Sequence, residues 1–72
     1  MSEHVYKTIE LTGSSKLSSD EAVRNAIAKA NQSVDYMGWF KVIETRGHIT
    51  DGAVEHWQVT IKVGFRLDSD DD

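Results

Sequence analysis

The sequence predicts an α+β domain: a β-α-β-β chain whose three-stranded antiparallel sheet curls around one helix. Three observations lead to this fold class. Residues 53–67 alternate between apolar and polar side chains, residues 18–21 carry a helix-capping signal, and Gly52 closes a short loop between two strand-like segments. The chain of 72 residues is expected to form one domain over residues 1–67.

The first strand is expected over residues 4–12, where Val5, Ile9 and Leu11 share one side of an alternating pattern. The turn-forming residues Gly13-Ser14-Ser15 follow directly. They predict that the strand ends at Thr12.

A helix is expected to begin after Ser18. Ser18 and Glu21 have the spacing of a capping box, and acidic residues in the first turn favour the positive end of the helix dipole. Apolar residues continue at intervals of three and four up to Gly38, which is predicted to end the helix in a left-handed conformation. The expected apolar face consists of Val23, Ile27, Ala30, Val34 and Met37.

Residues 39–49 predict a second strand, Thr50-Asp51-Gly52 a short loop, and Ala53–Leu67 a long third strand. The third strand would run roughly 50 Å at about 3.3 Å per residue. A compact domain of this length has a radius of gyration of roughly 11 Å by the usual scaling. The strand must therefore curl strongly or project into neighbouring copies, which predicts a subunit of an assembly.

The composition excludes several classes of protein. A net charge of −4 and a pI near 5.2 argue against a nucleic-acid partner, because phosphate contacts need concentrated Lys and Arg. The absence of cysteine excludes disulfides and thiolate chemistry. No membrane partner is expected, since no apolar run approaches the roughly 20 residues of a membrane span. The expected location is the cytoplasm, and the acidic residues 68–72 are expected to form a disordered tail.

Trp39 is the first candidate binding residue, because it begins a strand directly after the predicted helix stop. A large aromatic side chain at such an edge is most often a core or subunit-contact residue. The functional alternative is a stacking platform, in which an indole near a symmetry axis faces its own copy and encloses a planar ligand.

Gln58 lies on the polar side of the third strand, where a solvated surface residue is the ordinary interpretation. Its amide nevertheless complements the imide edge of a pyrimidine ring, with one acceptor and two donors. In a simple hairpin register with Ile49 opposite Ala53, Trp39 and Gln58 point to opposite faces of the sheet. Either a bulge or twist of the strand reorients one of them, or the pocket draws them from different subunits.

In that same register Arg46 pairs with His56. Arg46, His48 and Glu44 then form either a solvated face of weak charge pairs or an anion site helped by Arg66. The three histidines of the chain show no metal-ligand spacing, so no metal site is expected. No catalytic residues are expected either, because the nucleophile and phosphate-loop motifs are absent.

Several segments of the chain form a specific combined pattern. Three core segments are Gly38-Trp39-Phe40-Lys41-Val42, Arg46-Gly47-His48-Ile49 and the run from Asp51 to Leu67. The N-terminal strand and turn add Val5-Tyr6-Lys7 and Leu11-Thr12-Gly13-Ser14-Ser15. Together these segments resemble the bacterial branch of the dodecins, and the match covers nearly the whole chain, from about Val5 to Leu67.

The resemblance implies a β-α-β-β subunit in a hollow homododecamer that binds flavin pairs where subunits meet at two-fold axes. It places the tryptophan that stacks on the isoalloxazine at Trp39, and the glutamine that contacts the pyrimidine edge at Gln58. The implied cofactor is FMN, with riboflavin and FAD as alternatives, and Arg46 is the first candidate for a phosphate contact, before Arg66. Coenzyme A is a ligand of some bacterial dodecins and has no assigned site here.

Three functions remain to be distinguished. The leading hypothesis is a non-enzymatic FMN storage and sequestration protein that quenches flavin photochemistry. The second is a flavin-dependent redox enzyme, which needs a face of the flavin open to a hydride donor. The third is an interaction module in which Trp39 is part of a subunit contact and no flavin binds.

Overall fold

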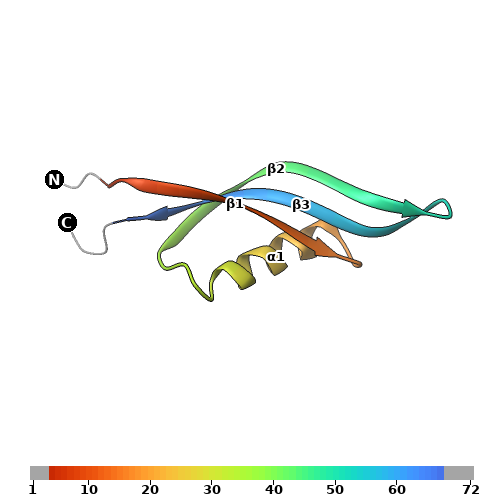
Figure 1. Ribbon diagram of the computed structural model, residues 1–72, viewed down its shortest axis with the longest axis horizontal. Coiled ribbons are helices and arrows are strands. Elements are labelled where there is room, and N and C mark those ends of the chain that lie inside the picture. The colour runs from red at the N-terminus through yellow and green to blue at the C-terminus, as the bar shows by residue number, and fades with distance from the viewer. Residues whose placement is uncertain (1–3, 68–72) are drawn as a thin grey trace.

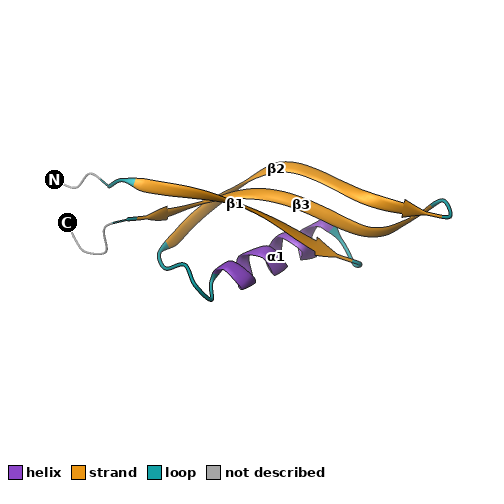
Figure 2. Cartoon of the chain, in the orientation of Figure 1, coloured by secondary structure: helices purple, strands orange, loops and turns teal. Residues whose placement is uncertain are grey.

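The computed structural model describes residues 4–67. The elements are β1 (Tyr6–Ser15), α1 (Ser19–Ala30), β2 (Met37–Thr50) and β3 (Ala53–Arg66). The three strands form one antiparallel sheet in the order β1-β3-β2, with α1 on one side of it (Figures 1 and 2). This arrangement confirms the predicted fold class.

The subunit is elongated. It measures 56 × 20 × 13 Å and has a radius of gyration of 15.0 Å, which exceeds the roughly 11 Å expected for a compact chain of this length. The β2–β3 hairpin extends well beyond the end of α1 (Figure 1). The long ribbon therefore leaves most of β2 exposed on the isolated subunit.

The core lies where α1 crosses the sheet. Val59, Ile61 and Val63 of β3 are buried against Ala22 and Ala26 of α1. Because these helix residues are alanines, the helix approaches the sheet closely, and it packs mainly on β1 and β3. The buried stripe of α1 thus runs through Ala22, Ala26 and Ala30, and the larger Val23 and Ile27 are only partly buried beside it.

The first strand is longer than the sequence pattern indicated. The prediction that Gly13-Ser14-Ser15 ends the strand is wrong, because β1 continues to Ser15 in register with Trp57. Gly13 is a buried ladder residue, and a Cβ at this position would overlap the carbonyl oxygen of Ala22. The glycine is needed for the close approach of α1, and it does not form a turn.

The predicted start of the helix is confirmed. Ser18 is the N-cap, and its Oγ accepts a hydrogen bond from the Glu21 N–H at 3.0 Å. The backbone N–H of Ser18 donates to Ser15 Oγ at 3.5 Å. The N-terminal groups of the helix are thereby satisfied partly from the end of β1.

The predicted end of the helix is wrong. α1 ends at Ala30 with Asn31 as its cap, and Gly38 lies within β2. The stretch after Ala30 is rich in Asn, Ser, Val and Asp, which are weak helix formers. The residue with positive φ in this connection is Tyr36, at 65°. Tertiary pairing of Met37 with Phe65 directs the chain into the sheet although the apolar spacing continues.

The hairpin register differs from the simple prediction. Thr50 lies directly opposite Ala53, and the intervening Asp51 and Gly52 have φ of 54° and 78°, as in a two-residue turn with both central residues left-handed. The ladder then shifts at three places, between Met37 and Trp39, Val42 and Glu44, and His48 and Ile49. These irregularities decide which side chains share a face.

The predicted acidic tail, residues 68–72, lies outside the described residues. In residues 4–67, no helix is long and apolar enough to cross a bilayer.

Candidate functional site

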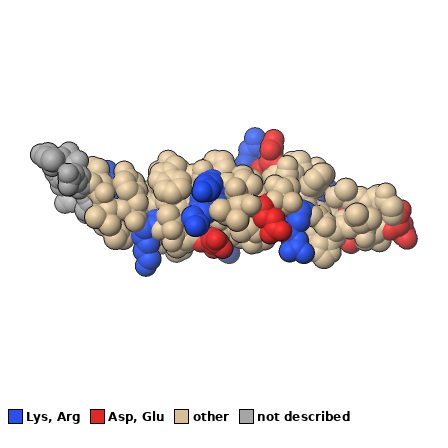
Figure 3. All heavy atoms as spheres, turned by 90° about the horizontal axis from the view of Figure 1, so that it is seen from above, with Lys and Arg blue, Asp and Glu red and all other residues tan. Residues whose placement is uncertain are grey.

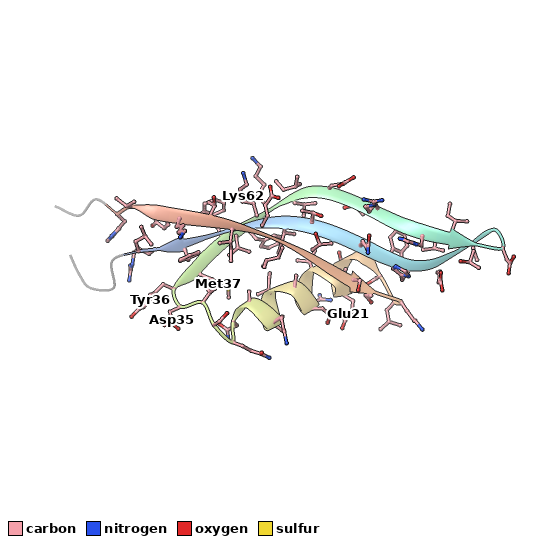
Figure 4. All side chains as sticks on the ribbon, viewed as in Figure 1. Glu21, Asp35, Tyr36, Met37 and Lys62 are labelled. Atoms are coloured by element: carbon pink, nitrogen blue, oxygen red, sulfur yellow. The ribbon has the colours of Figure 1, made fainter. Side chains whose placement is uncertain are left out.

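The side of the sheet opposite α1 carries the candidate residues. Val59, Ile61 and Val63 of β3 face the helix, so the alternate residues of β3 face the other way. Lys62 is one of them and projects away from α1 (Figure 4). We call this side the outer face. On β3 it consists of His56, Gln58, Thr60, Lys62, Gly64 and Arg66.

A bulge in β2 places Trp39 on the outer face. Val42 pairs with Ile61 and Glu44 pairs with Thr60, so Ile43 is an extra residue between two ladder pairs. Beyond this bulge Trp39 lies opposite Gly64, and directly opposed residues share a face. The sequence left open whether a distortion of the strand reorients Trp39 or the pocket is formed by different subunits, and the structure contains a bulge that reorients Trp39.

The indole of Trp39 covers Gly64. A Cβ at position 64 would overlap the five- and six-membered rings of the indole, so the glycine provides the space in which the ring lies. Trp39 nevertheless remains 45% exposed in the subunit. A cavity of about 180 Å³ near Trp39 is lined by Ile27 of α1, Met37 and Phe40, so it lies on the helix side of the sheet and not on the outer face. Trp39 is therefore an accessible aromatic surface on the outer face.

Gln58 and Arg46 form a pair farther along the outer face. The predicted pairing of Arg46 with His56 is wrong, because Arg46 lies opposite Gln58. On its other side Gln58 lies opposite Ser14 of β1. The row contains an amide, a guanidinium and a hydroxyl group, a set of donors that suits an anionic or imide-like ligand.

Trp39 and Gln58 share a face but lie far apart within one subunit. Gly64, the partner of Trp39, is six residues from Gln58 along β3, which corresponds to about 20 Å of strand. This separation is greater than the length of a fused three-ring system.

Arg66 is the last residue of β3, whereas Arg46 lies on β2 opposite Gln58. The guanidinium carbon of Arg66 is 5.4 Å from the centroid of the Tyr36 ring, and its backbone N–H donates to the Tyr36 carbonyl at 3.3 Å. Eight residues separate Arg66 from Gln58, which is about 26 Å of strand. Arg46 and Arg66 of one subunit therefore cannot bind the same phosphate.

The corrected register also reveals a pair that the sequence pattern did not indicate. His48 lies directly opposite His56, and the two imidazole rings stack with centroids 4.5 Å apart and an interplanar angle of 22°. The sequence contains both histidines, but only the correct pairing of β2 and β3 brings them together. Within residues 4–67, no group of three or more His, Cys, Asp or Glu side chains is arranged to hold a metal ion.

Charged groups of both signs are scattered over the molecule seen from the side opposite α1 (Figure 3). Across the sheet, Glu10 lies opposite Lys62, and Lys62 lies opposite Lys41. The view shows scattered charges rather than one broad basic surface.

Together, the elongated subunit, its largely exposed β2 and the accessible indole define a small sheet-and-helix protein with an exposed aromatic surface. The Dodecin family model matches residues 5–68. The chain belongs to the dodecin family, whose members are small flavin-binding proteins known to form oligomeric assemblies.

Individual relatives agree with this assignment. The dodecin of Thermus thermophilus is 41% identical over 64 residues, which cover 89% of this chain and 93% of the relative. The solved dodecin of Streptomyces davaonensis is 47% identical, with a TM-score of 0.88 over 94% of this chain and 100% of that one. The dodecin of Streptomyces coelicolor is also 47% identical, with a TM-score of 0.89 over 97% and 100% of the two chains.

Proposed function

We propose that the protein stores and sequesters FMN by stacking flavin pairs between Trp39 side chains at subunit interfaces of a homododecamer. The observation that carries this proposal is the half-exposed indole of Trp39, held flat over Gly64 on the outer face. A rigid aromatic surface of this kind contributes a large contact area at a small entropic cost. An isologous contact would supply the same surface from both sides of the ligand.

Gln58 completes the slot from a different subunit. Its amide offers donors and an acceptor to the pyrimidine edge of the isoalloxazine. The separation of about 20 Å along β3 between Gln58 and Gly64, the partner of Trp39, supports this division between subunits. Each slot would then draw its stacking ring and its hydrogen-bonding amide from two different chains, so a single subunit has no complete site.

Arg46 is the proposed phosphate contact. It is exposed and lies opposite Gln58, so a ligand whose pyrimidine edge meets Gln58 has the guanidinium close by. A guanidinium pairs well with a phosphate, which favours FMN over riboflavin. Arg66 remains a weaker candidate, because it lies at the other end of the strand against Tyr36. FAD is an alternative ligand, and a coenzyme A site is not assigned to residues.

The proposed mechanism is physical and not catalytic. An indole in van der Waals contact with an excited flavin donates an electron and regains it quickly, so little photochemistry escapes. A flavin-dependent redox enzyme needs an open face on the ring for a hydride donor. A closed stack of two flavins between two indoles leaves no such face. Storage in the cytoplasm, without nucleic acid or membrane as a partner, fits the acidic composition.

The proposal is tested by titrating the purified protein into FMN, riboflavin and FAD while flavin fluorescence is measured. Storage predicts strong quenching that saturates at one flavin per chain, with FMN bound more tightly than riboflavin. Sizing should give about twelve times the mass of the chain. A monomer without quenching would contradict the proposal, and steady-state turnover with a nicotinamide donor would favour an enzyme.

Mixed assemblies test whether one slot uses two chains. Trp39→Ala and Gln58→Leu subunits should each bind FMN weakly alone, since one lacks the ring and the other the amide. When the two are unfolded, mixed equally and refolded, random assembly restores about one quarter of the Trp–Gln combinations. Fluorescence titration should then show a tight-binding fraction that neither variant has. Its absence would mean that one chain supplies both groups.

Gly64→Ala tests the position of the indole. The added methyl group overlaps the Trp39 ring, so the ring must leave its place and FMN binding should weaken by about tenfold or more, equivalent to about 1.4 kcal/mol. Gly38→Ala is the matched control, because a Cβ there has nothing within 4 Å. The readout is FMN fluorescence quenching. Equal affinities for the two variants would contradict the assigned role of Gly64.

A further inference from the structure

The imidazoles of His48 and His56 lie together on the outer face at the hairpin end of the sheet. The rings are 4.5 Å apart and nearly parallel. His48 is exposed and His56 is half-buried. Within residues 4–67, the structure gives these two side chains no hydrogen bond or ion pair, and their mutual stacking is the contact that it records. Their ring nitrogens are therefore available to a ligand.

The backbone holds the two rings in place. His48 and His56 are directly opposed on β2 and β3, and such pairs have Cβ atoms about 4.5–5.5 Å apart. The bulge between His48 and Ile49 follows immediately and fixes this register. Binding of one ligand to both rings therefore costs the protein little conformational entropy.

The spacing suits a bridging metal ion. In a tetrahedral Zn²⁺ site with bonds of about 2.0–2.1 Å, the centroids of two imidazole ligands lie about 5 Å apart, because each centroid is about 1 Å behind its ligating nitrogen. The observed centroid separation of 4.5 Å is close to that value, but the rings are stacked at 22° and must tilt to direct one nitrogen each toward a common ion. The χ2 torsion of histidine has a broad energy profile, which permits this rotation.

We propose that His48 and His56 form a two-imidazole site for a borderline transition-metal dication, for which Zn²⁺ is the probe. Neutral imidazole is a ligand of zinc, copper and nickel, whereas Mg²⁺ and Ca²⁺ prefer several oxygen ligands. Water completes the coordination. The ligands of this site, His48 and His56, are not among the residues proposed to bind FMN, but they lie next to the Arg46–Gln58 pair on the outer face, so the site is tested in the absence of flavin.

The neighbouring charges limit the affinity and shape the selectivity. Arg46 is two residues from His48 on the same face, and Lys16 lines a cavity beside His56. Glu55 follows the turn, where its Oε1 accepts a hydrogen bond from Thr50 Oγ1 at 2.9 Å. The two cations disfavour hard ions that bind mainly through charge. The two cations also lower the affinity for a transition-metal dication, but imidazole still binds such a metal in preference to Mg²⁺ or Ca²⁺.

The test is calorimetric titration of Zn²⁺ into the full chain without an affinity tag, after removal of metals with a chelator and in the absence of flavin. The expected result is one Zn²⁺ per chain. His48→Phe and His56→Phe should each weaken binding by about tenfold or more, equivalent to about 1.4 kcal/mol. Phenylalanine preserves an aromatic cross-strand pair and lacks a ligand nitrogen.

The matched control is His4→Phe, which removes a histidine far from the pair and should leave Zn²⁺ affinity unchanged. A second readout is thermal unfolding, because an ion that bridges β2 and β3 stabilises the native state. Zinc should raise the Tm of the parent protein and of His4→Phe, but not of the two pair variants. Absence of Zn²⁺ binding, or binding that persists in both pair variants, would show that the rings only stack.

Discussion

Replacing Trp39 by alanine is expected to weaken FMN binding by about 30-fold or more, equivalent to about 2 kcal/mol, while the assembly remains intact. The ring is 45% exposed, lies over Gly64 and is not part of the buried core cluster. Its removal therefore takes away ligand contact area and leaves the core of the subunit unchanged. Flavin fluorescence quenching gives the affinity, and size-exclusion chromatography gives the assembly state.

Trp39→Phe is the graded control for this change. A smaller ring on the same backbone keeps part of the stacking area, so its FMN affinity should lie between those of the parent protein and Trp39→Ala. The alternative function, a subunit contact without flavin, predicts the opposite pattern. In that case Trp39→Ala dissociates the assembly, with or without FMN, and the interaction module becomes the better assignment.

Replacing Ile61 by alanine is expected to destabilise the subunit by about 2–5 kcal/mol. Ile61 is 0% exposed and belongs to the buried cluster that includes Val59, Val63 and Ala22 of the helix. Deleting most of its side chain leaves a cavity that a helix already in close contact cannot easily fill. Urea unfolding followed by circular dichroism measures the loss, at one fixed protein concentration because assembly contributes to stability.

Ile61→Val provides the internal scale for that measurement. It removes a single methylene group and should destabilise by about 0.5–1.5 kcal/mol. A loss for Ile61→Ala no larger than that for Ile61→Val would mean that the centre of β3 is not the packed core of the subunit.

These two expectations separate the roles of the two sides of β3. The side facing α1 is a small core built from three aliphatic residues and the alanines of the helix. The outer face carries the groups proposed to bind ligands. Because successive side chains of a strand point to opposite faces, the odd-numbered residues 59–63 of β3 form the core and the even-numbered residues form the outer face.

The sequence alone determined the element order, the helix start and the long alternating third strand. These features depend on local physics. A capping serine and the backbone N–H that donates to it lie within four residues of each other. The alternation of apolar and polar side chains follows from the pleat of a strand. The chemistry of an indole and of an amide also marks Trp39 and Gln58 as candidates in the sequence, although their roles remain predictions.

Tertiary structure decided what local pattern could not. The apolar spacing through Met37 predicted a longer helix, but β2 pairing ends α1 at Ala30. The extra residue Ile43 turns Trp39 onto the outer face, and the shift at His48 sets Arg46 against Gln58 and His48 against His56. Bulges depend on long-range pairing and close packing between segments, and they leave no periodic trace in the chain. The sequence therefore determined which residues are chemically capable, whereas the register of the sheet decided which of them meet.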